Sequence, residues 1–514
     1  MTPVSGDAFA TFLLGEANSA GVLVTDRIRT QAYCLSGYVQ DDWRATSRLT
    51  LYLGLRWETE LPRRSPDDSQ NSFNPGRINP VSGTLGVVTF AGRGGVPRNA
   101  FRPDWNNFGP RMGLAFRFPF QQETVLRAGG SLFYASTVSN TIGDSASLGF
   151  STQASLVAAQ PELESAMRLA TGFPAVQRPL LNDAFGAVPL GERPNTSVGF
   201  FKPDQVAPVS YQYNVNVQRE LTGETVVEVG YMANLSRRLT ANYLALNQVR
   251  ASELGPWDAQ SLRSFPQFSD VYWINPSIGN SSYHGGFAGL ERRFHHGFSL
   301  LAHYMFSKVI DDVASADEYG DPGSYMDAYN RRLDKGLSGS DVPHRLVATG
   351  LYETPSLGSR RWLNRVGGSW RVGTIATLQS GPPFTVTTAA NTTNAFTAGP
   401  LRPDLVRNPA LPAGQRSLGR WFDTDAFRLP APFRFGNSPR GGLRGDVLQT
   451  IDMTVAKEFA FAERYRVDFR GEFYNLLNHA NFELPGRVMG AADFGAVLSA
   501  RAARTIQLGL RLSF

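Results

Sequence analysis

Apolar and polar residues alternate one by one along much of this chain, in stretches of roughly 9 to 12 residues. In residues 49–57, four leucines and Trp57 share one side, while Thr50, Tyr52 and Arg56 share the other. A period of two is that of a β-strand, whose successive side chains point to opposite faces of the sheet. Such stretches exceed the strand length of soluble domains, about 5 to 6 residues, and suit a tilted membrane crossing. The pattern predicts an all-β chain of long strands.

The carboxy-terminus carries the clearest of these stretches. Apolar residues occupy every second position and form one stripe, namely Ile506, Leu508, Leu510, Leu512 and Phe514. Such a face is unusual at the end of a water-soluble chain, but lipid covers it in the closing strand of an outer-membrane β-barrel. We therefore predict that this stripe faces lipid and is the assembly signal that the barrel-assembly machinery engages by strand pairing.

Short and long connections alternate between the predicted strands. Turns such as residues 221–224 and 295–297 alternate with long connections rich in Pro, Gly and Asn, such as residues 58–107. Outer-membrane barrels have short periplasmic turns and long extracellular loops. The sequence thus predicts an antiparallel transmembrane outer-membrane β-barrel with roughly 13 to 14 recognisable strands, and a further one near residues 22–29. A soluble two-sheet sandwich would show the same alternation, but not loops of about 40 to 70 residues.

Composition narrows the class further. No run of about 18 apolar residues occurs, which excludes membrane-spanning helices. The net charge is +6, and the basic residues are spread along the chain, so no nucleic-acid partner is predicted. Cys34 is the only cysteine, which excludes a disulfide framework, and we expect it to be a small buried residue within a strand.

The sequence carries no recognisable catalytic motif. The six histidines include no H-E-x-x-H motif, and no nucleophile elbow or phosphate-binding glycine loop is present. We therefore predict no catalytic residue, no cofactor and no metal site, and a chain that is not an enzyme. A soluble sandwich enzyme is the least favoured alternative, because it explains neither the loop alternation nor the terminal stripe.

The amino-terminus does not fit an exported protein. Residues 1–7 have no basic region, apolar core or small-residue cleavage site. Since an outer-membrane protein needs a signal peptide, either the membrane assignment is wrong or the chain begins inside a longer protein.

Several motifs, in order along the chain, carry a resemblance to a known family. They are YVQDDW at residues 38–43, NNFGPRMG at 106–113, QSGPPF at 379–384 and RGEFYNLLNHANF at 470–482. With the terminal strand, they resemble the carboxy-terminal barrel of TonB-dependent outer-membrane receptors, in the Oar-like branch that carries a carboxypeptidase-regulatory-like domain. The resemblance covers nearly all of residues 1–514.

The resemblance implies more than the residues show. In this family a barrel of about 22 strands is closed by an amino-terminal plug. Uptake of a large or scarce solute, such as a glycan, peptide or metal chelate, is driven by the TonB–ExbB–ExbD complex. Residues 1–514 would then be the carboxy-terminal barrel part, about 13 to 16 of those strands, without plug or signal peptide. The expected location is the outer membrane of a Gram-negative cell. A surface or adhesive barrel without transport, and a passive porin, are alternatives.

Overall fold

The computed structural model of the chain describes residues 7–17, 19–26, 29–120, 123–136, 148–158, 164–173, 175–313, 324–355, 366–396, 399, 401–461 and 465–514. The amino-terminal prediction concerns residues 1–7, of which 1–6 lie outside the described residues. Helix is rare in the described part. The α-helix α1 (Ala8–Leu13) begins at Asp7, whose Oδ1 accepts hydrogen bonds from the N–H groups of Phe9 and Ala10. The 3₁₀ turns are η2 (Leu169–Thr171), η3 (Ala251–Glu253), η4 (Arg331–Asp334), η5 (Ala413–Gln415) and η6 (Thr424–Ala426).

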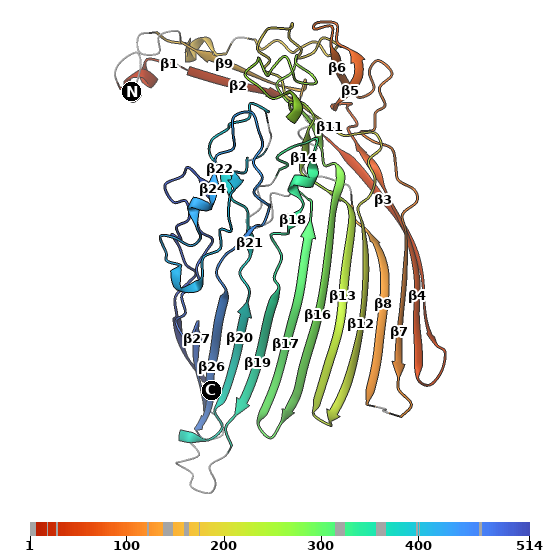
Figure 1. Ribbon diagram of the computed structural model, residues 1–514, viewed down its shortest axis with the longest axis vertical. Helices are drawn as coiled ribbons and strands as arrows, with labels where there is room; N and C mark the ends of the chain where they lie inside the picture. Colours follow the sequence, from red (N-terminus) through yellow and green to blue (C-terminus); the bar gives the residue numbers. More distant parts are fainter. Residues whose placement is uncertain are drawn as a thin grey trace.

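One antiparallel sheet of 14 strands dominates the molecule and forms a curved wall (Figure 1). Thirteen of its strands follow one another along the chain, and the two-residue β18 (Gly336–Leu337) joins β17 beside this path. In order they are β3 (Gln31–Arg44), β4 (Leu49–Arg64), β7 (Phe108–Arg117), β8 (Thr124–Tyr134), β12 (Val209–Thr222), β13 (Thr225–Thr240), β16 (Ser277–His295), β17 (Phe298–Asp311), β19 (His344–Glu353), β20 (Arg371–Gln379), β26 (Leu448–Phe461), β27 (Tyr465–Tyr474) and β29 (Thr505–Ser513). The predicted all-β antiparallel fold is confirmed.

The wall has two different rims. At the short-turn rim, residues 223–224 connect β12 to β13 and residues 296–297 connect β16 to β17. His296 and Gly297 both have positive φ, at 50° and 76°, the geometry of a tight hairpin turn between twisted strands. The long connections gather at the opposite, long-loop rim, and the carboxy-terminus lies near the short turns (Figure 1).

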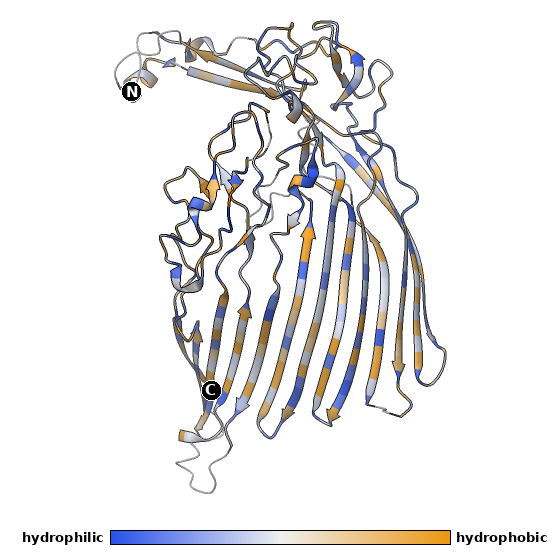
Figure 2. Cartoon of the chain, in the orientation of Figure 1, coloured by the Kyte–Doolittle hydropathy of each residue, from blue (hydrophilic) through white to orange (hydrophobic). Residues whose placement is uncertain are grey.

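The register keeps the apolar stripes of neighbouring strands on one face. Tyr231 of β13 lies opposite Val215 of β12 and Gly286 of β16, and the same in-register pairing continues from strand to strand. Hydrophobic and hydrophilic residues accordingly alternate along the long strands (Figure 2). We call the face with the apolar stripes the outer face and the opposite one the inner face. A slip of one residue would exchange the two faces of a strand, so the pattern determines the register.

The wall ends in two edge strands. In the described part of the chain, β3 pairs only with β4, and β29 pairs only with β27. Every residue of β3 is exposed, so the expectation that Cys34 is buried was wrong: the single cysteine is exposed, because no further strand covers this edge. Asp41 interrupts the outer stripe of β3, and a charge on an edge strand disfavours unwanted pairing.

Short strands pair within the loops at the long-loop rim. These are β1 (Glu16–Ala17) with β10 (Met167–Arg168), β2 (Ser19–Thr25) with β9 (Ser151–Val157), β5 (Asn71–Ile78) with β6 (Leu85–Phe90), β11 (Val198–Phe200) with β15 (Val271–Ile274) and β14 (Tyr243–Ala245), β21 (Pro383–Phe384) with β25 (Leu443–Arg444), β22 (Thr387–Thr388) with β28 (Val488–Met489), and β23 (Asp404–Leu405) with β24 (Phe427–Arg428). The strand predicted near residues 22–29 corresponds to β2, which lies outside the main sheet.

Most of the buried apolar residues belong to these loops, and only a few, such as Val209, Ala233 and Val309, lie in strands of the wall. One cluster joins Phe73 and Phe90 of the β5–β6 hairpin to Phe268 and Val271. A second joins Phe384 and Phe422 with their neighbours from the 380–447 and 475–504 connections. The loops thus fold into a cap with its own cores, whereas the wall exposes its apolar stripes.

Candidate functional site

The structure places the five predicted residues of the terminal stripe on one face of the edge strand β29. Leu510 lies opposite Phe469, and Leu512 opposite Val467. The stripe is open to the surroundings, with exposed fractions of 53% for Ile506, 67% for Leu508, 74% for Leu510, 58% for Leu512 and 89% for Phe514. One side of this strand is paired and its apolar face is uncovered, which is the geometry that strand pairing in a membrane would use.

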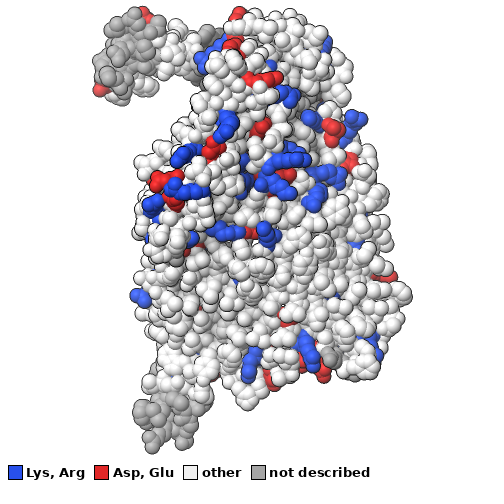
Figure 3. Space-filling view, viewed as in Figure 1, with Lys and Arg blue, Asp and Glu red and all other residues white. Residues whose placement is uncertain are grey.

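The outer face continues as an uncharged belt across the wall. Figure 3 shows few charged side chains on this belt, bounded toward the long-loop rim by a band of Lys, Arg, Asp and Glu. Near that band, the Tyr231 hydroxyl lies 2.6 Å from Nδ1 of His284, and the Tyr304 hydroxyl lies 2.8 Å from Nδ1 of His344. Aromatic residues with a polar end are typical of the boundary between a lipid core and water.

Lys457 is a cation on the same face, close to the short-turn rim. Its ammonium donates to the carbonyl of Gly368 and lies 5.2 Å from the centre of the Trp370 ring. The side chain thus carries its charge toward the rim while its aliphatic part stays among aromatic residues, as lysines at membrane boundaries do.

The inner face is polar, and several of its charged groups have ion-pair or hydrogen-bond partners. Arg56 and Glu58 form an ion pair of 2.8 Å on β4. Farther along the sheet, the Arg127 guanidinium donates to Gln218, and the Asn216 amide donates to Glu228. Such a face would suit a water-filled lumen, since a closed barrel of this many strands encloses more space than inward side chains can fill.

Three arginine–aspartate pairs join two long loops at the rim. Arg402 and Asp334 lie 2.8 Å apart with side chains 2% and 4% exposed, and they connect the 401–447 segment to the turn η4. Arg440 pairs with Asp311 at the end of β17, and Arg444 pairs with Asp341 in the connection between β17 and β19. We call these three pairs the loop latch. They hold the cap to the end of β17.

The electrostatics of the latch centre on Asp334. Burial raises the pKa of this carboxyl above its usual value, and the attraction of the Arg402 guanidinium only partly opposes that effect. Desolvation is therefore the larger contribution, as in many buried ion pairs. The pair sets the position of the loops more than it stabilises them.

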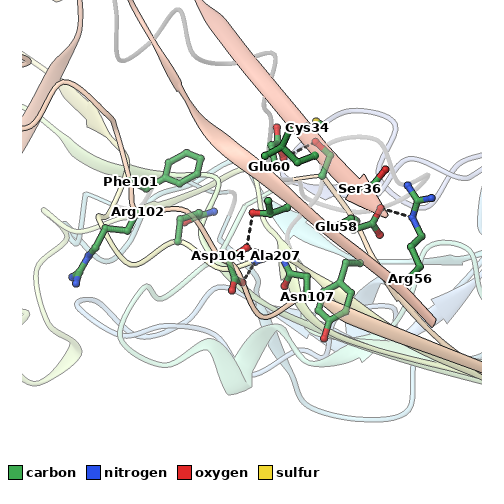
Figure 4. A pocket seen from close by; sticks show the side chains of 16 residues that line it. Cys34, Ser36, Arg56, Glu58, Glu60, Phe101, Arg102, Asp104, Asn107 and Ala207 are labelled. Atoms are coloured by element: carbon green, nitrogen blue, oxygen red, sulfur yellow. Dashed lines mark hydrogen bonds and ion pairs between the residues drawn. The ribbon is translucent and has the colours of Figure 1, made fainter. Parts of the chain in front are cut away.

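A cavity of about 130 Å³ lies between the long-loop ends of β3, β4 and β8 (Figure 4). Its wall includes the edge-strand residues Cys34 and Ser36. Asp104 organises the loop side, because its carboxylate accepts from the N–H of Ala207 and its carbonyl accepts from the Thr59 hydroxyl. Carboxylate and hydroxyl groups lie close together here, beside an exposed edge strand. Such an arrangement can bind a polar solute.

A second cavity, of about 600 Å³, lies between the β2–β9 ribbon and the β11–β15–β14 sheet. The rings of Tyr243 and Tyr272 meet edge to face at 5.1 Å in its wall, beside Asn242 and Gln153. Burial, and to a lesser degree the Asp270 carboxylate, raises the pKa of the Tyr272 hydroxyl, so this group stays a hydrogen-bond donor at neutral pH. Aromatic rings beside amides can bind an amphipathic solute.

Sequence reasoning located the terminal stripe but neither cavity nor the loop latch. Within the described residues, no three His, Cys, Asp or Glu side chains gather to hold a metal ion. No helix in the described part of the chain is both long and apolar enough to cross a membrane.

Comparison with known proteins defines the class. A family model described as an outer membrane beta barrel domain matches residues 1–507. The chain therefore belongs to this family, and it is a protein of the outer membrane. No curated protein matches the sequence.

Solved structures with distant similarity are outer-membrane transporters and receptors. The outer membrane transporter YddB from Escherichia coli has 9% identity and a TM-score of 0.45, with 94% of this chain and 54% of that chain covered. The ferric yersiniabactin uptake receptor FyuA from Yersinia pestis has 10% identity and a TM-score of 0.43, with 96% of this chain and 47% of that chain covered. The ferric-catecholate import receptor Fiu from E. coli has 9% identity and a TM-score of 0.41, covering 95% and 45%. The chain spans about half the length of these proteins.

Proposed function

We propose that this chain forms the loop cap and most of the barrel wall of an outer-membrane receptor for energised uptake of a large or scarce solute, of the TonB-dependent, Oar-like kind. The observation that carries the proposal is the folded cap. Apolar cores and the latch order its loops, and it contains cavities of about 130 and 600 Å³. A passive pore has less use for an ordered, cavity-bearing cap. In this proposal the chain has no catalytic role, cofactor or metal of its own.

The parity of the strands supports a longer parent protein. Because 13 antiparallel strands form the path, the two edges β3 and β29 run in the same direction. They cannot pair antiparallel with each other, so closure requires an odd number of further strands. A total of about 22 meets this condition. Those strands, a plug and the TonB-contacting segment would belong to the rest of the protein.

The transport proposal is tested by deleting the gene and measuring entry of radiolabelled ferric chelates, peptides and oligosaccharides. We expect one of these classes to lose uptake, and the same class to lose uptake when TonB is removed and this gene is intact. Uptake that needs this gene but not TonB would indicate a passive porin. Unchanged uptake of every class, with reduced attachment of cells to surfaces, would instead support the adhesive alternative, which the extensive loop surface favours.

The length proposal has its own measurement. An antibody against the 401–447 segment should detect, in isolated outer membranes, a band at about twice the mass of the 514-residue chain. A band at the mass of 514 residues alone would contradict the proposal and leave the energised mechanism without its plug.

The proposed orientation places the long-loop rim at the cell surface. Gly414 in that rim and Gly223 in a short turn both have open space where a side chain would extend. In a Cys34→Ser background, we expect a membrane-impermeant maleimide to label Gly414→Cys on intact cells. Gly223→Cys should react only after the outer membrane is permeabilised. The reverse order of labelling would invert the topology.

A further inference from the structure

A groove of about 530 Å³ lies at the long-loop end of β13, β16 and β17, away from both cavities described above. It is lined by Arg237, Asn280, Ser282, His284, Lys308, Ile310, Asp311, Asp312 and Lys335. A strongly polar groove of this size is unexpected on the lipid side of a barrel wall. The face and the height at which this groove lies therefore determine which kind of ligand it can bind.

The register places the groove on the outer face. Arg237 lies opposite Asn280, and His284 lies opposite Lys308. These positions follow, at intervals of two, the outer-face residues Tyr231 and Tyr304. The groove therefore lies on the outer face, at the end of these strands that leads to the long-loop rim. A ligand here would sit above lipid and not in the lumen.

The groove has an excess of positive charge. Lys308 and Lys335 are exposed, and Arg237 donates from Nη1 to the carbonyls of Ser236 and Ser281 at 2.8 and 3.0 Å. Among the described residues, none of these three cations forms an ion pair. Each of these three cations can therefore still attract an anion.

The groove also holds two carboxylates, which are outnumbered by its three cations. Asp312 accepts hydrogen bonds from the backbone N–H of Asn280 at 2.5 Å and from its side-chain amide at 3.1 Å. Asp311 is buried and pairs with Arg440 of the loop latch. His284 is exposed beside Lys308 and can add a further donor.

We propose that this groove binds the phosphate groups of a glycolipid headgroup in the outer leaflet of the outer membrane. The headgroup phosphates would contact Arg237, Lys308 and Lys335, while the acyl chains would lie against the uncharged belt below. Basic pockets at membrane boundaries bind phosphorylated headgroups through the same combination. The site rests on the proposed orientation of the rims, but not on transport of any solute.

The test is binding of a defined lipid by the detergent-solubilised full chain. Lipid A with two phosphates is titrated at low salt and followed by native mass spectrometry. The triple variant Arg237→Gln, Lys308→Gln and Lys335→Gln should bind about 100-fold more weakly, and Lys308→Gln alone about fivefold more weakly. Dephosphorylated lipid A should bind the unaltered chain as weakly as the triple variant binds lipid A.

Three controls separate the alternatives. A matched variant removes three basic side chains at the short-turn rim, by Arg48→Gln, Arg219→Gln and Arg292→Gln, and should bind as the unaltered chain does. Inorganic phosphate should fail to displace lipid A at equal concentration; displacement would indicate a site for free phosphate. Equal binding by the triple variant, or equal loss in the matched variant, would overturn the assignment. The exposed Lys308→Gln change keeps the test valid if the triple variant does not fold.

Discussion

We expect Leu510→Arg to prevent insertion of this protein into the outer membrane. Leu510 lies in the middle of the terminal stripe, opposite Phe469, and 74% of its side chain is uncovered. A cation pointing to the lipid core from a barrel strand costs about 2–4 kcal/mol. The same side chain would also disturb the strand that the assembly machinery is proposed to engage. Fractionated outer membranes should contain little of the variant, and periplasmic proteases should degrade it.

The matched control places the same residue on the other face of the same strand. Gln507 lies opposite Glu472 on the inner face, where a new arginine meets a carboxylate. Gln507→Arg should therefore insert normally. Phe514→Asp and deletion of residues 505–514 should both fail to insert if the stripe is the assembly signal. Normal insertion of Leu510→Arg would show that this face does not contact lipid.

The second large effect is expected at the loop latch. Asp334→Asn keeps an acceptor for the N–H of Met326, which now bonds to the carboxylate at 3.2 Å, but leaves the buried Arg402 guanidinium without a counter-ion. An uncompensated buried charge costs about 3–5 kcal/mol. Hydrogen exchange measured by mass spectrometry should show the 324–343 and 401–447 segments opening more readily, while the strands of the wall keep their protection.

Removing both charges should restore most of that loss. In Asp334→Asn with Arg402→Met, no buried ion remains, and replacing such a pair is often neutral. Asp67→Asn serves as the control, because its ion pair with Arg29 is 41% and 58% exposed and contributes about 1 kcal/mol or less. A double variant that opens as readily as Asp334→Asn would contradict the assignment of the loss to the unpaired Arg402.

The strand pairs with short turns were predictable from the sequence. In the β12–β13 and β16–β17 pairs, strands longer than ten residues lie on both sides of a two-residue turn. In these hairpins, both the residue pattern and the strand pairing involve residues that are close together in the sequence. The β2 strand shows the limit, since it pairs with β9 through Val22 and Ala154, which are far apart in the chain. Its pattern predicts a strand but cannot name its partner.

The candidate site was likewise predictable only in part from the sequence. The terminal stripe lies within nine successive residues, so alternation alone located it. Arg402 and Asp334 are 68 positions apart, and nothing near either residue indicates the other. One feature of the sequence indicates the basic groove: Lys308 continues an apolar stripe that ends at Phe306. A cation in this position, at the end of a membrane strand, is a sequence feature that points to a lipid contact.

The sequence by itself determined the class, the long strands, the two faces of the wall and the apolar stripe at the end of the chain, because each follows from side-chain alternation over neighbouring residues. Only the tertiary structure decided how the loops fold. Their cores, latch, cavities and basic groove join residues that lie far apart along the chain. These contacts depend on loop closure and burial, which no local pattern records.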